Sequence, residues 1–176
     1  ESFLTNTKNY IENDLKKDGY LNSRVNIVST PDSIGSNRLN LNINVDKGER
    51  IKIKNITFSG NEIFGDFKLK SKLKKTKKKF PLRFWKKSKL IESDYEADKE
   101  NLISFYKEKG YRDARVEFDT IIINDEKTID IALNVDEGNK YYFGDIDYLG
   151  NSSYTNFQLD QILGIKKGDS YNGVLL

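Results

Sequence analysis

The 176-residue chain contains neither cysteine nor histidine, and these two absences remove several functional classes. Without cysteine the chain has no disulfide bond and no thiol nucleophile, and without histidine it lacks the usual imidazole base. The same two residue types are the usual ligands of structural zinc. We therefore expect no catalytic residue, no metal and no cofactor. Lack of cysteine is compatible with an oxidising compartment but does not establish one.

Long apolar runs and prolines are also scarce. No stretch reaches the ~18 apolar residues that a membrane-spanning helix needs, and the sequence has only two prolines. Hydrophobic residues make up 36% of the chain and charged residues 32%, a composition that fits soluble folded modules.

The chain does contain an internal repeat. The string Asn-Val-Asp-x-Gly begins at Asn44 and again at Asn134, 90 residues later, and each copy runs on to a Gly-Asn pair. A second block, which includes Gly-Tyr at positions 19 and 110, recurs at an offset of 91 residues. Chance similarity of two hairpins is the alternative, but both blocks recur in the same order. A fixed period predicts an array of modules that acts as a surface or a spacer.

The repeat predicts three parts. Residues 49–138 should form one complete module, residues 1–48 the C-terminal part of an earlier module, and residues 139–176 the N-terminal part of a later one. The chain begins at Glu1 without an initiator methionine. We expect the parent protein to continue beyond this sequence on both sides.

Period-two alternation predicts a hairpin in the second half of each module. Ile129, Ile131, Leu133 and Val135 alternate with polar residues, which indicates a strand with one buried and one wet face. The segment around Arg112–Ile123 alternates in the same way, with Arg115, Glu117 and Asp119 expected to point outward. Turn residues at 124–126 join the two strands.

A helix should precede this hairpin. Ser93 and Glu96 have the spacing of a capping box, an apolar stripe follows, and Gly110 stands where a left-handed residue ends a helix. A strand and a shorter helix open the module, so its order is β-α-α-β-β. With short connections, this order predicts an α+β fold: a three-stranded mixed sheet with the third strand in the centre, covered on one face by two helices. The second strand then lies at an edge.

These motifs together resemble the POTRA family, as found in the periplasmic arrays of outer-membrane protein assembly factors of the Omp85 superfamily. The resemblance rests on Ile56–Asn61, Lys109–Ala114, Val135–Gly138 and Gly164–Tyr171, in that order and spacing. Each motif alone is weak, but the set covers nearly the whole chain. The frequent Lys, Asn and Ile suggest a Bacteroidota-type Gram-negative source.

The resemblance implies a parent protein at the periplasmic face of the outer membrane, with a membrane β-barrel after its POTRA modules. It implies no catalytic residues. Its implied partners are unfolded outer-membrane β-barrel proteins and accessory lipoproteins. The candidate client-binding residues are those of the edge strand, where an extended client could pair: Arg112, Asp113, Ala114, Arg115, Val116, Glu117, Phe118, Asp119 and Thr120.

A basic segment, Lys68–Lys89, departs from the short helix connection of the family. It holds 12 Lys or Arg and no acidic residue; subtracting it from the totals of 30 and 27 leaves 18 basic and 27 acidic residues, a net charge of −9. Such asymmetry suggests a contact surface. Its candidate contact residues are Lys77, Lys78, Lys79, Arg83, Phe84, Trp85, Lys86 and Lys87.

Four interpretations of this segment remain open: a solvated surface, a contact with lipid headgroups, a contact with an acidic patch on a neighbouring module or subunit, and nucleic-acid binding. The acidic remainder and the family resemblance argue against nucleic acid. For the whole chain, the alternatives to an assembly factor are another Omp85 member (a TamA-like factor or a secretion pore) and, from a different class, a nucleic-acid-binding protein that uses residues 68–89.

Overall fold

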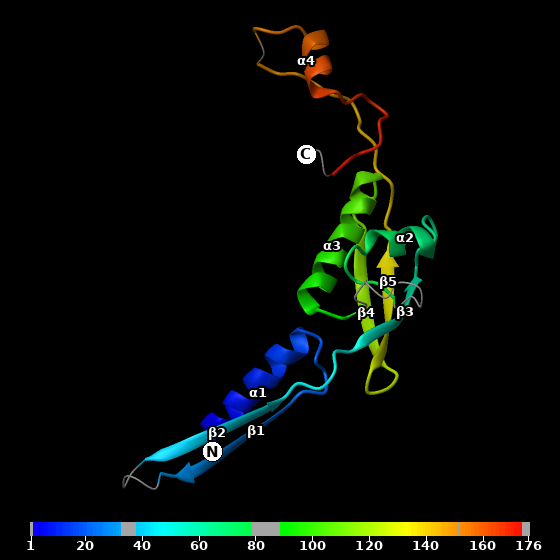
Figure 1. Ribbon diagram of the computed structural model, residues 1–176. Coiled ribbons are helices and arrows are strands. Elements are labelled where there is room, and N and C mark those ends of the chain that lie inside the picture. The colour runs from blue at the N-terminus through cyan, green and yellow to red at the C-terminus, as the bar shows by residue number, and fades with distance from the viewer. Residues whose placement is uncertain (1, 33–37, 79–88, 151, 174–176) are drawn as a thin grey trace. The chain divides into compact units, whose positions relative to one another are not determined.

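The computed structural model describes residues 2–32, 38–78, 89–150 and 152–173 (Figure 1). The described helices and strands are, in chain order, α1 (Ser2–Lys17), β1 (Arg24–Pro31), β2 (Leu39–Asp46), β3 (Lys52–Ser59), α2 (Asp66–Lys72), α3 (Glu92–Glu108), β4 (Arg115–Ile123), β5 (Thr128–Asp136) and α4 (Asn156–Leu163). The chain divides into two compact units, residues 1–57, 73–98 and 120–132 in one and residues 58–72, 99–119 and 133–176 in the other.

In the first unit, α1 is followed by an antiparallel hairpin of β1 and β2. The register runs from Arg24 opposite Asp46 to Pro31 opposite Leu39, which places Ile27 opposite Ile43. All eight residues of β2 are exposed.

Gly19, after α1, has a φ of +86°. A Cβ there would lie 2.1 Å from the carbonyl oxygen of Leu90, and the Gly19 carbonyl accepts a hydrogen bond from the amide of Ile51 at 2.9 Å. Glycine is required here for both its left-handed backbone and the close approach.

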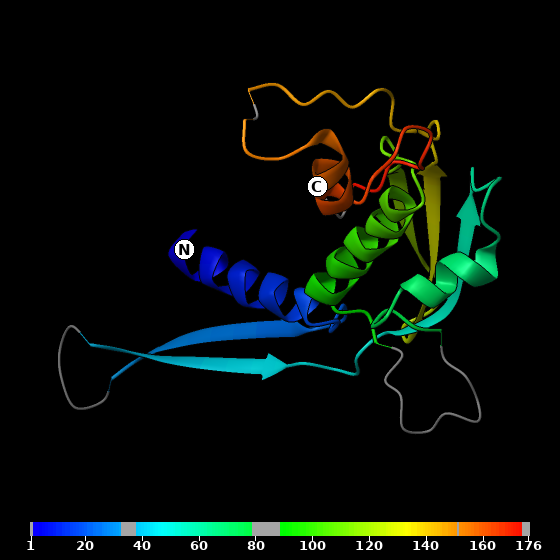
Figure 2. The same cartoon turned by 90° about the horizontal axis from the view of Figure 1, so that it is seen from above.

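A three-stranded sheet follows, in the order β3-β5-β4, so the predicted central position of the third module strand is confirmed. The arrows of β3 and β5 point the same way in Figure 2. Every second residue of β5 is buried, from Ile129 to Val135, and none of these four side chains is more than 1% exposed. The predicted α+β class with a mixed sheet covered by two helices is confirmed. The module boundaries at 48/49 and 138/139 stay a prediction.

The helices supply the other side of this core. Leu69 of α2 and Leu102 of α3 are fully buried, and the ring of Phe64 lies 4.9 Å from that of Phe105 and 5.2 Å from that of Tyr106. The predicted capping box at Ser93 is wrong, because α3 already begins at Glu92 and Ser93 lies inside it. The helix ends as expected, with a φ of +96° at Gly110.

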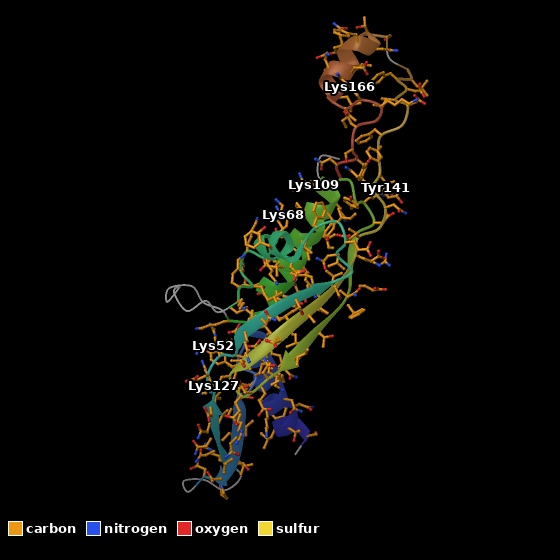
Figure 3. The ribbon with its side chains drawn as sticks, turned by 90° about the vertical axis from the view of Figure 1, so that its right-hand side faces the viewer. Lys52, Lys68, Lys109, Lys127, Tyr141 and Lys166 are labelled. Atoms are coloured by element: carbon orange, nitrogen blue, oxygen red, sulfur yellow. The ribbon has the colours of Figure 1, made fainter. Side chains whose placement is uncertain are left out.

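The second unit closes with α4. Thr155 caps this helix by accepting a hydrogen bond from the amide of Gln158, whose side chain caps the Thr155 amide in return. Further back along the chain, the amide of Tyr141 donates to the carbonyl of Gly110 at 2.8 Å, the same contact that Ile51 makes with Gly19. Figure 3 shows Tyr141 after the sheet and Lys109 at the end of α3.

Candidate functional site

The strand β4 has one strand neighbour, β5, and its other edge is not paired with any described strand. An unpaired edge presents backbone N–H and C=O groups that another extended chain can use. Three of the candidate residues, Arg112, Asp113 and Ala114, do not belong to this edge, because β4 begins at Arg115. Ala114 is buried at 5% exposure in the turn before the strand. The candidate edge therefore begins at Arg115 and ends at Ile123. Of the predicted client-binding residues, it keeps Arg115–Thr120.

The charged side chains of β4 differ in what they contact. Arg115 forms an ion pair with Asp136 of the neighbouring strand β5. Asp119 forms an ion pair with Lys99 of α3 at 3.2 Å. The expectation that Asp119 stands on the outer face with Arg115 and Glu117 is therefore wrong, since its carboxylate is held by the helix that packs on the sheet.

Several apolar side chains of the same strand are exposed to solvent. Phe118 is 58% exposed although the alternation predicted it to be buried, and Ile121, Ile122 and Ile123 are 43%, 50% and 66% exposed. Because successive residues of a strand point to opposite faces, consecutive exposed isoleucines mean that both faces are open at this end of β4. The edge therefore offers apolar contacts next to its backbone groups.

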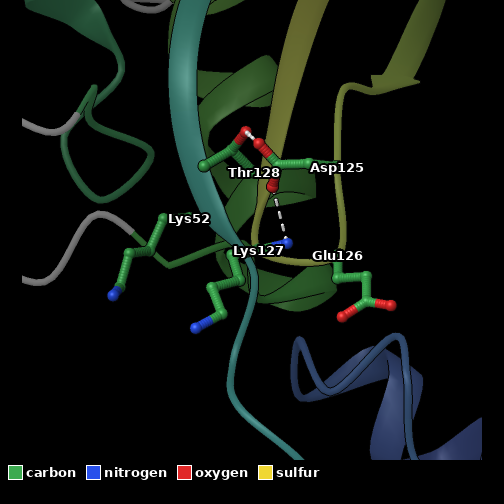
Figure 4. A pocket seen from close by; sticks show the side chains of 5 residues that line it. All are labelled: Lys52, Asp125, Glu126, Lys127 and Thr128. Carbon is green, nitrogen blue, oxygen red and sulfur yellow. Dashed lines mark hydrogen bonds between the residues drawn. The ribbon is translucent and has the colours of Figure 1, made fainter.

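The turn between β4 and β5 borders an open hollow, shown in Figure 4, lined by Lys52, Asp125, Glu126, Lys127 and Thr128. Asp125 accepts hydrogen bonds from the amide of Lys127 at 2.7 Å and the hydroxyl of Thr128 at 2.8 Å. These contacts, the Lys127 amide first, lower the pKa of the Asp125 carboxyl. Asp125 thus shapes the turn, and the hollow balances two lysines against two carboxylates.

Two buried carboxylates also serve the fold. Asp98 is fully buried and accepts hydrogen bonds from the amides of three successive residues, 74–76, at 2.5–2.8 Å. Glu137 is 7% exposed and accepts from the amides of Glu62 and Ile63 at 2.9 and 2.8 Å. Their oxygens are occupied by chain amides, so neither is placed for chemistry. The part of the chain that the structure describes shows no group of three or more residues able to hold a metal ion.

The candidate contact residues of the basic segment lie mostly outside the described residues. Lys77 is half-buried and Lys78 is exposed. Lys79, Arg83, Phe84, Trp85, Lys86 and Lys87 are not described, so their role stays a prediction. Among the described helices, none has the length and apolar character needed to cross a membrane.

Comparison with known proteins agrees with this fold. The POTRA family model, described as "Surface antigen variable number repeat", matches residues 51–138. The outer membrane protein assembly factor BamA of Neisseria meningitidis serogroup B is 29% identical over 160 residues, which is 88% of this chain and 20% of the relative. A putative outer membrane protein assembly factor of Treponema pallidum is 31% identical over 136 residues, which is 74% of this chain and 16% of the relative.

Among solved structures, the crystal structure of Haemophilus influenzae BamA POTRA3-5 superposes with a TM-score of 0.52 at 21% identity, over 94% of this chain and 65% of that one. This likeness concerns the fold. The chain spans a fifth or less of the length of the two curated relatives. The Bacteroidota source suggested by composition stays a prediction. Because the family match covers half of the sequence and the solved array shares the fold, the chain belongs to the POTRA family.

Proposed function

We propose that this chain is part of the periplasmic POTRA array of an outer-membrane protein assembly factor, where it scaffolds the assembly machinery and receives unfolded β-barrel clients. The observation that carries the proposal is the unpaired edge of β4 with its exposed apolar side chains. Two curated relatives named as outer-membrane protein assembly factors support it. The role is binding, without catalysis.

The mechanism is strand addition to β4. A client segment in extended conformation pairs its backbone with the free edge, and this pairing requires no particular client sequence. That property suits a protein that handles many different β-barrels, because all of them share the same backbone groups. Phe118 and the exposed isoleucines at 121–123 add apolar contact to alternate side chains of the client strand.

Charge on the same strand limits unwanted pairing. Glu117 is exposed, and Arg115 at the start of β4 is 60% exposed although its guanidinium pairs with Asp136 of β5. Charged side chains on an edge strand oppose permanent edge-to-edge association between copies. Binding of clients at this edge is therefore expected to be weak and reversible.

The other parts of the proposal concern the parent protein. A membrane β-barrel follows the POTRA modules, accessory outer-membrane lipoproteins bind to the array, and the basic segment Lys68–Lys89 contacts lipid headgroups. The POTRA membership and the names of the relatives support the barrel and the array. The lipid contact is supported only by the 12 Lys or Arg, without an acidic residue, in Lys68–Lys89.

NMR titration with a peptide from an outer-membrane barrel strand tests the edge. Amide shifts should concentrate along 115–123, and Phe118→Ser should weaken binding by about fivefold, the upper range for one cross-strand pair. Phe67→Ser is the matched control, because Phe67 is equally apolar and 89% exposed but lies on α2. Shifts confined to the helices, or equal weakening by both variants, would reject strand addition to β4.

A further inference from the structure

Strand β4 contains one residue more than the stretch of β5 that it faces. Near the turn, the amide of Asn124 donates to the carbonyl of Thr128 at 3.0 Å. At the far end of the pair, Arg115 forms its ion pair with Asp136. On β4 nine positions separate these two places, whereas on β5 only eight do. One extra residue on one strand of an antiparallel pair is a β-bulge.

Side-chain directions place this bulge at Glu117 and Phe118. Val116 is half-buried while the residues on either side of it are exposed, so its side chain points to the covered face of the sheet. Asp119 points to the same face, because its carboxylate pairs with Lys99 of α3 at 3.2 Å. These two residues are three positions apart, where a regular strand has a spacing of two. The pair between them is exposed, which explains why Phe118 departs from the alternation.

Beyond the bulge, the backbone groups of β4 alternate between β5 and the free edge. Because the amide of Asn124 bonds to β5, residues 122 and 120 also direct their backbone groups to β5. The same alternation on β5 turns the Val135 carbonyl away from β4, toward Gly60 directly after β3. The residues of β4 whose N–H and C=O groups are directed to the free edge are Asp119, Ile121 and Ile123.

The edge beyond the bulge also lacks the exposed charges of its beginning. Arg115 and Glu117, which are exposed, lie before or in the bulge. In residues 119–123 the one charged side chain is that of Asp119, and it is paired with Lys99. The three isoleucines that follow are exposed. Since charges and bulges oppose pairing at an edge, residues 119–123 are the part of β4 that is open to another strand.

The other outer strand of this sheet, β3, offers less. Lys52 at its start forms a bridge with Lys89. Ile53 and Ile56 are 0% and 3% exposed although they are three positions apart, which indicates a second bulge. Only residues 56–59 then remain regular on β3.

We propose that the bulge at Glu117 and Phe118 restricts strand addition to residues 119–123 and thereby sets the register of the client. The occupant is a short extended segment of an outer-membrane barrel strand, whose apolar side chains at every second position lie beside Ile121 and Ile123. The inference rests on the proposed function and deepens it. A barrel strand has ~10 residues, so about half of it stays unpaired, which favours release of the client.

Peptide length tests the restriction in the unaltered 176-residue chain. Two peptides from one outer-membrane barrel strand, of about six and about ten residues, are titrated and followed by NMR. Both should shift the amides of residues 119–123, leave those of residues 115 and 116 in place, and bind with affinities within about twofold of each other, since no further cross-strand pair forms. A longer peptide that binds about fivefold tighter and shifts residues 115 and 116 would overturn the restriction but leave strand addition intact.

Deletion of Glu117 tests the bulge directly. It places Val116 and Asp119 two positions apart, with Phe118 between them, and so restores a regular strand. The longer peptide should then bind about fivefold tighter than the shorter one, with shifts that extend to Arg115. A folded deletion variant that still binds both peptides equally would overturn the role of the bulge.

A substitution pair at Ile121 tests the outward groups, and it decides the matter if the deletion variant does not fold. Ile121→Pro removes an amide directed to the free edge without breaking a bond to β5, so peptide binding should be lost. Ile121→Thr, the matched control, keeps the amide and should weaken binding no more than about fivefold. Equal binding by the two variants, or shifts at residues 56–59 of β3, would overturn the inference. Shifts confined to the helices would overturn it together with the proposed function.

Discussion

The hydroxyl of Tyr106 on α3 donates a hydrogen bond of 2.7 Å to the carboxylate of Glu137, directly after β5. The same carboxylate accepts from the amides of Glu62 and Ile63, so it joins the helix, the end of the central strand and the loop before α2. One repeat earlier, the place of Glu137 is taken by Lys47. The earlier copy of the repeat therefore lacks this carboxylate clamp.

Removing the hydroxyl of Tyr106 should destabilise the fold. Tyr106→Phe deletes one hydrogen bond to a buried carboxylate, and the free energy of unfolding should fall by about 1.5–3 kcal/mol. Glu137→Ala should cost more, because the Tyr106 hydroxyl and the amides of Glu62 and Ile63 then all lose their acceptor. Urea denaturation measures both. Tyr142→Phe, at an exposed tyrosine, should change little; an equal loss there would show that the Tyr106 bond contributes nothing special.

Because the pKa of the Tyr106 hydroxyl is raised, we also expect the free energy of unfolding to fall at alkaline pH. Burial first, and then the hydrogen bond to Glu137, raise the pKa of this phenol far above its ordinary value of 10.0. Its contribution is fully present below pH 10 and is lost as pH rises, because the unfolded chain releases this proton while the folded chain keeps it. Wild type should lose about 1.4 kcal/mol per pH unit above pH 10 relative to Tyr106→Phe. Parallel stability curves for the two proteins would contradict the shift.

Asp98 should be essential for the loop after α2. Asp98→Ala leaves the amides of residues 74–76 without their acceptor, and we expect a loss of about 3 kcal/mol or more. Asp98→Asn keeps one accepting oxygen and should lose less. Glu100→Ala, at an exposed position of the same helix, is the control. Thermal unfolding that ranks Asn below Ala in stability would be inconsistent with this role.

The two faces of β5 should respond differently to truncation. Leu133 is 1% exposed, and Leu133→Ala should destabilise the fold by about 2–5 kcal/mol through lost burial and a cavity. Asn134 points to the other face, where its amide donates to the Ser59 hydroxyl at 2.9 Å, and Asn134→Ala should cost little. Chemical denaturation of the two variants decides the point, and comparable losses would mean that both faces are packed.

Some features were predictable because they depend on neighbours in sequence. The alternation from Ile129 to Val135 follows from the two-residue period of a strand, and it identified the buried face of β5. Gly110 ends α3 because only a left-handed residue without a Cβ suits that position. The strand order β3-β5-β4 followed from short connections and from the most regularly apolar strand being central.

The candidate edge was predicted only in outline. Its existence followed from strand order, but its start at Arg115 and the exposure of Phe118 did not, because alternation assumes one phase along the whole strand. Asp119 is drawn to Lys99, which is 20 residues distant in sequence and on another element. Pairings of this kind leave no local signal in the sequence.

The sequence by itself determined the class of the fold, the repeat of about 90 residues and the POTRA family, because periodicity and glycine placement are local properties that survive without tertiary contacts. Only the tertiary structure decided which charged side chains are buried and which apolar side chains are exposed. In the sequence, Asp98 is one of several carboxylates near the start of a helix. In the structure it is fully buried, and it accepts hydrogen bonds from a loop that lies more than 20 residues earlier in the chain. Phe67 is apolar, yet it is exposed, because burial depends on which elements pack together rather than on the side chain alone.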